Sequence, residues 1–93
     1  MKYEDMIVKN HVGHHKSAVQ IAKEKSIVFA AIQKCGEIAS FSNVLRVIGE
    51  DKMRYRDMQL RIRDLRRAGF IIYDRNAGIY KPTGKMPNDI GNI

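Results

Sequence analysis

Arginine is concentrated in one short segment of this chain, in a pattern suited to binding phosphate. Residues 54–70 read RYRDMQLRIRDLRRAGF and hold six of the eight arginines in the sequence, with Asp57 and Asp64 as the acids among them. Helix neighbours three or four positions apart can form ion pairs, but two carboxylates cannot neutralise six guanidinium groups. Arginine gains affinity for phosphates by displacing their counterions. The segment therefore predicts contact with a polyanion, in preference to an ordinary solvated helix face.

The composition of the whole chain agrees with a small basic domain. The 93 residues carry a net charge of +7 with a pI near 9.8, and 44% of them are apolar. This length supports one domain, and this apolar content argues against disorder throughout. No apolar run is long enough to span a membrane, and no signal-peptide pattern opens the chain. Cys35 is the single cysteine, which excludes an intramolecular disulfide and fits a cytoplasmic protein.

Helical periodicity precedes the arginine segment. Residues 17–34 have a helical apolar pattern, with an expected break at Lys25–Ser26 where the apolar stripe drifts. Residues 37–40 suit a very short extended segment. Ser42 is the expected N-cap of a helix over 43–48, and Gly49 is its expected end.

The arginine segment itself predicts a helix of about four turns that Gly69 ends. On a helical wheel, Met58, Ile62 and Leu65 point into the core. The opposite side carries the arginines, with Leu60 outward among them. Strand-forming residues follow at 70–74 and 79–81, joined by the turn-forming sequence RNAG, so a β-hairpin is expected.

A helix that ends in RDLRRAGFII and leads into a hairpin resembles the winged helix-turn-helix superfamily. The matching features are Leu65, two arginines, a small residue, Gly69 and an apolar strand, with Ile62 and Met58 at the family's core spacing. The resemblance covers about residues 26–82. It implies an α+β, mostly helical fold, with a three-helix core and a two- to three-stranded β-wing. The expected organisation is an N-terminal arm over 1–16, this domain over 17–82 and a flexible C-terminal tail over 83–93.

The resemblance also implies roles for particular positions. Residues 43–48 would be the positioning helix, 55–68 the recognition helix that enters the major groove, and 71–81 the wing. The connection before the recognition helix is longer than in the tightest family pattern, so the helix starts either after a loop or earlier, near Lys52. The candidate DNA-binding residues are Arg46, Lys52, Arg54, Tyr55, Arg56, Gln59, Leu60, Arg63, Arg75 and Lys81. Arg66 and Arg67 are expected instead to complement the dipole at the C-terminal end of the helix.

Other kinds of site have little support in the sequence. His11 and His15 have the spacing that places two imidazoles on one helical face, but Gly13 lies between them and further ligands are missing. No phosphate-binding glycine motif and no spaced pair of catalytic groups occurs. We expect no catalysis, no metal, no cofactor and no small-molecule substrate.

The sequence thus predicts sequence-specific binding of double-stranded DNA by a small transcriptional regulator of a prokaryote, or of its virus or mobile element. The expected location is the cytoplasm, which is the host cytoplasm for a viral protein. The helix over 17–34 favours a homodimer over mere completion of the core. The alternatives are a replication or recombination accessory factor, a winged-helix protein-interaction module and a binder of structured RNA. A continuous positive band from Arg46 through residues 54–70 to Arg75 would support the DNA-binding interpretation.

Overall fold

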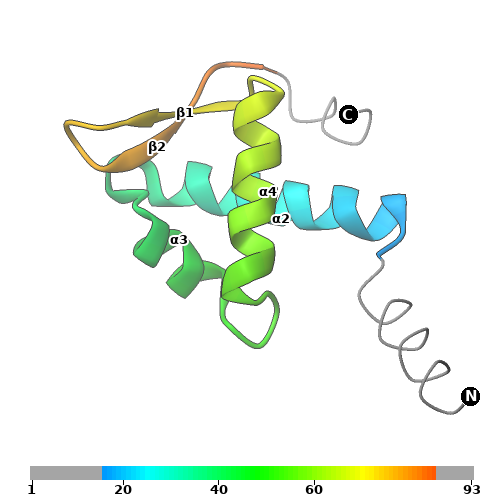
Figure 1. The fold of residues 1–93 in the computed structure, drawn as a ribbon. Coiled ribbons are helices and arrows are strands. Elements are labelled where there is room, and N and C mark those ends of the chain that lie inside the picture. Colours follow the sequence, from blue (N-terminus) through cyan, green and yellow to red (C-terminus); the bar gives the residue numbers. More distant parts are fainter. Residues whose placement is uncertain (1–15, 86–93) are drawn as a thin grey trace, which may run out of the picture.

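Residues 16–85 fold into three α-helices and a two-stranded antiparallel sheet in the computed structural model (Figure 1). In chain order the elements are α2 (Ala18–Cys35), the 3-10 turn η1 (Gly36–Ile38), α3 (Phe41–Ile48), α4 (Tyr55–Arg67), β1 (Ile71–Asp74) and β2 (Ile79–Pro82). The expected α+β, mostly helical class is confirmed. Nearly all of the expected arm, including its three histidines, and most of the expected tail lie outside the described residues.

The core forms where α2, α3, α4 and β1 meet. Met58, Ile62 and Leu65 point inward from α4 as predicted, and none is more than 4% exposed. Phe70, which follows α4, is fully buried and meets the ring of Phe29 on α2 edge-on, with 6.0 Å between ring centres. Each such side chain contributes about 1.5–3 kcal/mol through its burial, so this cluster holds α4 against α2.

Helix α2 is continuous, and the predicted break at Lys25–Ser26 is wrong. The Ser17 hydroxyl accepts a hydrogen bond from the Gln20 N–H at the start of the helix. The apolar stripe drifts because Glu24 and Lys25 occupy inward positions and are both buried. Charged residues in the interior, not a change of helix, therefore explain the irregular pattern.

Helix α3 begins earlier than predicted. Its N-cap is Ser40, whose hydroxyl accepts a hydrogen bond from the Asn43 N–H at 3.2 Å, so the assignment of Ser42 as the cap is wrong. Capping by a serine satisfies an amide that lacks a partner in the first turn of the helix. Helix α3 therefore starts at Phe41, which places this aromatic ring in its first turn.

The extended segment expected over 37–40 is not a strand. The turn η1 occupies its first half, and one backbone hydrogen bond, from the Tyr80 N–H to the Ala39 carbonyl at 2.9 Å, joins it to β2. One such bond fixes the position of the hairpin without adding a third strand. Among residues 16–85, the sheet therefore has two strands.

The connections before and after α4 agree with the predictions from the sequence. A loop joins α3 to α4, and α4 starts at Tyr55, so the longer connection is not an earlier helix start. Gly69 has a φ of +84°, a conformation that disfavours other residues, and it turns the chain from α4 toward β1. Strands β1 and β2 then pair with Tyr73 opposite Tyr80, and their rings lie 4.9 Å apart as expected for a cross-strand pair.

Candidate nucleic-acid interface

Helix α4 separates two sides of the molecule. The N-terminal half of α2 lies on one side of it, and α3 and the β1–β2 hairpin lie on the other (Figure 1). Both acids of α4 have partners on or next to the α2 side. Asp57 lies 3.1 Å from the Lys16 ammonium, and Asp64 lies 3.6 Å from the Arg61 guanidinium. The acidic charge of α4 is thus engaged away from the hairpin.

Arg61 is buried and is not a surface cation. The prediction that all six arginines of residues 54–70 form one excess of positive charge is therefore wrong for Arg61. Arg61 is 7% exposed, and its guanidinium lies 3.6 Å from Glu24 of α2, which is 5% exposed. Local spacing could not reveal this partner because Glu24 is far from Arg61 in the sequence. Among the described residues, the facing atoms of the pair have no hydrogen-bond partner, so their attraction is ionic.

Lys16 completes this charged cluster from the surface. Its ammonium donates to Glu24 and contacts Asp57. Burial disfavours the charged form of Lys16, but the hydrogen bonds and charges of these two carboxylates outweigh it and raise its pKa. The cluster links α2 to α4, so it has a structural role and leaves the opposite side of α4 to other arginines.

Four exposed arginines in the segment have no acidic partner among residues 16–85; they are Arg54, Arg56, Arg66 and Arg67. Arg63 contacts Asp64 at 3.5 Å, yet half of its side chain is exposed. Long, exposed ion pairs of this kind contribute little. The free positive charge therefore follows the outer and hairpin-facing sides of α4.

Most residues predicted to meet base edges do lie at the surface. Arg54, Tyr55, Arg56 and Gln59 are all exposed at the N-terminal half of α4. Leu60 is only partly exposed, so the prediction that it lies outward among the arginines needs correction. Side chains one turn apart on a helix are neighbours, and the long stems of the flanking arginines cover part of a leucine between them.

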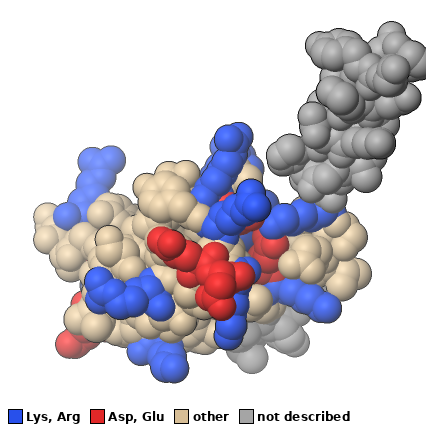
Figure 2. All heavy atoms as spheres, turned by 90° about the horizontal axis from the view of Figure 1, so that it is seen from below, with Lys and Arg blue, Asp and Glu red and all other residues tan. Residues whose placement is uncertain are grey.

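Acidic residues interrupt the expected positive band near α3. Arg46 is exposed and donates to the Asn43 side chain at 3.0 Å, but it lines a shallow groove together with Glu50 and Asp51. Figure 2 shows acidic side chains in the middle of the face that contains this connection, with basic side chains around them. Arg46 consequently has acidic neighbours at the α3–α4 connection, which also carries exposed Lys52.

The hairpin offers one cation at its tip and one that is already paired. Arg75 is exposed in the turn between β1 and β2. Lys81 lies 2.9 Å from the Asp74 carboxylate. This contact, together with hydrogen bonds from the Ala77 and Asn76 amides, lowers the pKa of Asp74. Arg75 therefore remains the more available cation of the hairpin.

Sequence reasoning missed a basic groove between α4 and β1. Its lining residues are Arg63, Arg66, Arg67, Ile71, Ile72 and Tyr73. The sequence instead predicts that Arg66 and Arg67 complement the helix dipole. The spacing from Arg63 to Arg66 does place them on neighbouring turns, but the position of β1 beside them required the folded chain.

The described part of the chain, residues 16–85, contains neither a metal-binding cluster nor a membrane span. No group of three histidine, cysteine or acidic side chains there is placed to hold a metal ion. None of the described helices is long and apolar enough to cross a membrane. In comparisons with known proteins, no family model, curated protein or solved structure matches the chain.

Proposed function

We propose that this protein binds double-stranded DNA sequence-specifically, with α4 as the recognition helix and the β1–β2 hairpin as the wing of a winged helix-turn-helix domain. The observation that carries the proposal is the division of charge on α4. Its acids are engaged by Lys16 and Arg61, while Arg56 and its neighbours remain exposed without acidic partners in the described chain. A phosphate-rich partner would relieve the resulting repulsion.

The dimensions and exposure of α4 suit this role. Its 13 residues make a rod about 20 Å long, which fits the major groove of DNA. Arg56 and Gln59 near its N-terminal end would read base edges, since arginine pairs with guanine and glutamine with adenine. Arg63 would contact phosphates, and Arg75 at the hairpin tip would reach the adjacent minor groove.

Such a surface would act by occupancy, blocking or recruiting other proteins at the bound site. We therefore propose a small transcriptional regulator of a prokaryote, its virus or a mobile element. Two-fold pairing would supply the affinity that a single module lacks. A replication or recombination accessory factor would use the same surface, and the genomic position of the bound sites distinguishes it from a regulator.

Selection of bound duplexes from a randomised DNA library tests the proposal. We expect enrichment of one short sequence, and fluorescence anisotropy should then show weaker binding of it by Arg56→Ala and Gln59→Ala. Lys23→Ala is the matched control, because Lys23 is exposed on α2, away from α4. Absence of any enriched sequence, or equal losses in all three variants, would contradict sequence-specific binding through α4.

A further inference from the structure

The groove between α4 and β1 combines positive charge with exposed apolar surface. Arg63, Arg66 and Arg67 line it from α4, and β1 contributes Ile72 and Tyr73. Ile72 is 54% exposed and Tyr73 is 40% exposed. Duplex phosphates would satisfy the arginines but would leave this apolar surface in water. The groove therefore fits a ligand that carries phosphate and a flat apolar group together.

Tyr73 is held in place as a flat surface for such a group. Its ring packs at a tilt against Tyr80, with ring centres 4.9 Å apart. Tyr80 is the more buried of the two rings. Tyr73 therefore has one side open to solvent, while Tyr80 supports its other side. A supported ring loses little freedom when a planar group stacks on it, which favours binding.

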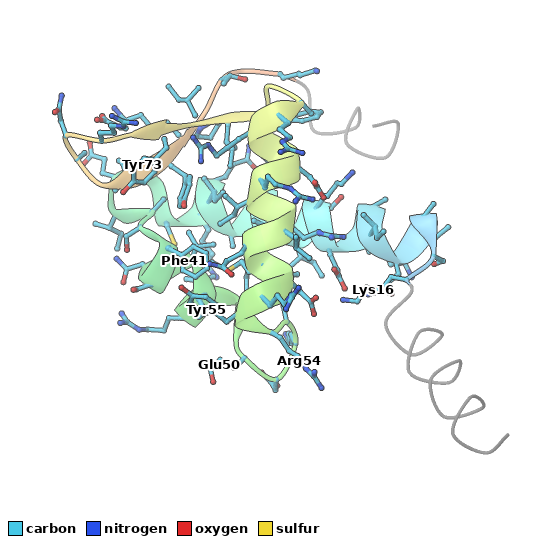
Figure 3. The ribbon with its side chains drawn as sticks, in the orientation of Figure 1. Lys16, Phe41, Glu50, Arg54, Tyr55 and Tyr73 are labelled. Atoms are coloured by element: carbon cyan, nitrogen blue, oxygen red, sulfur yellow. The ribbon has the colours of Figure 1, made fainter. Side chains whose placement is uncertain are left out.

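A second exposed ring lies on the same side of α4. Tyr55 is 56% exposed and packs against Phe41 of α3, again with 4.9 Å between ring centres. Figure 3 shows Tyr73, Phe41 and Tyr55 following one another along the hairpin side of α4. Burial raises the pKa of Tyr80, and the nearby phenols of Tyr73 and Tyr55 add to this rise while Arg66 opposes it. Two supported tyrosines thus lie along the hairpin side of α4, and one of them, Tyr73, lines the recess formed by the α4–β1 groove.

We propose that this recess binds unpaired nucleotides of a DNA strand that leaves the duplex, with a base stacked on Tyr73 and the backbone on Arg66 and Arg67. Aromatic rings interleaved with cations are the features that bind single strands, because every base has a stacking face and every linkage a charge. The inference rests on the proposed function for the position of the duplex on α4. It extends that function from a paired site to a junction between paired and unpaired DNA.

The test compares two fluorescein-labelled probes with the same base-paired sequence. One is blunt, and the other carries a single-stranded thymidine extension of about six nucleotides, within the range that one binding module covers. We expect the wild-type protein to bind the extended probe about tenfold more tightly. Equal binding of the two probes would overturn the inference while leaving duplex recognition by α4 intact.

Variants of Tyr73 test whether the tighter binding of the extended probe depends on the recess. Tyr73→Ala should abolish the advantage of the extended probe without changing binding of the blunt probe, whereas Tyr73→Phe should retain it. Equal weakening on both probes would overturn the role of Tyr73. Tyr73→Leu, which keeps apolar packing, replaces the alanine variant if circular dichroism shows that the latter fails to fold, and it carries the same expectation.

Removal of charge supplies an independent comparison. The double variant Arg66→Ala/Arg67→Ala should lose most of the advantage, and Lys23→Ala/Lys34→Ala, which removes two exposed charges from α2, should retain it. Equal effects of the two double variants would overturn the assignment of the backbone to the groove. A larger gain from a uridine ribonucleotide extension would overturn the DNA assignment in favour of RNA.

A final pair of outcomes separates this inference from the proposed function. Binding of a thymidine oligonucleotide that depends on Tyr73, without any binding of blunt duplex, supports the recess and refutes duplex recognition by α4. Binding of blunt duplex with no gain from the extension supports α4 and refutes the recess.

Discussion

Removal of the buried guanidinium of Arg61 should destabilise the fold strongly. The substitution Arg61→Met keeps a long apolar stem at the α2–α4 contact but leaves the Glu24 carboxylate, 5% exposed, without its arginine. Loss of one partner of a buried ion pair costs about 3–5 kcal/mol. Lys16 still contacts Glu24 from a partly exposed position, so we expect the lower end, about 3 kcal/mol.

That loss is a large part of the free energy of unfolding of a domain this small, which is about 5–10 kcal/mol. Urea denaturation followed by circular dichroism measures it. With a slope of about 1 kcal/mol per molar urea, the midpoint should fall by about 3 M. The slope itself should stay unchanged, because the variant buries nearly the same surface.

The double variant Glu24→Leu/Arg61→Met completes the comparison. It removes both charges together, so no buried charge is left without its partner, but it also removes the hydrogen bonds that Glu24 accepts from Lys16 and Gln20. Apolar replacement of a buried pair is often neutral or better, and each lost hydrogen bond costs about 1 kcal/mol, so we expect the double variant to be more stable than Arg61→Met and within about 2 kcal/mol of the wild type. A cost below about 1 kcal/mol for Arg61→Met, or a double variant as unstable as the sum of the singles, would refute the reasoning.

Three further predictions concern the parts that hold α3 and the hairpin beside α4. Ser40→Ala removes the cap that accepts the Asn43 N–H and should cost about 1 kcal/mol in urea denaturation, whereas a cost near zero would contradict the cap assignment. Gly69→Ala places a side chain at a φ of +84° and should lower the free energy of unfolding by about 1–2 kcal/mol, although open space surrounds the site. The lowered pKa of Asp74 means that its pairing with Lys81 stabilises the fold above the ordinary carboxyl pKa of 3.8 and that this contribution is lost as pH falls through the lowered value. The stability difference between wild type and Asp74→Asn should accordingly shrink in acid, and a difference that is constant with pH would contradict the pairing.

The sequence predicted elements whose determinants are local. The inward triad Met58, Ile62 and Leu65 follows from helical spacing, and the C-terminal end of α4 and the hairpin turn follow from Gly69 and Gly78. These features depend on neighbours within a few positions, which a linear pattern contains.

The errors concern features that distant residues decide. Glu24 and Arg61 lie far apart in the chain, so no local pattern shows that they form a buried pair. The sequence therefore could not explain the drift of the apolar stripe in α2, and it could not predict that Arg61 is removed from the surface. The α4–β1 groove likewise required the position of β1 beside Arg66. The choice of Ser40 over Ser42 as the cap was ambiguous in sequence because both are good N-cap residues.

The salt dependence of duplex binding tests the central claim most directly. Two exposed arginines are proposed to meet the backbone or minor groove of the duplex, namely Arg63 and Arg75, and Arg54 and Arg56 add two more at the base-reading end. At about 0.9 counterions released for each phosphate neutralised, a plot of log affinity against log salt concentration should have a slope of about −2 to −4. Duplex binding at low salt with a slope in this range supports recognition through α4. No binding at low salt, or a slope near zero, would contradict it and favour a protein-interaction module.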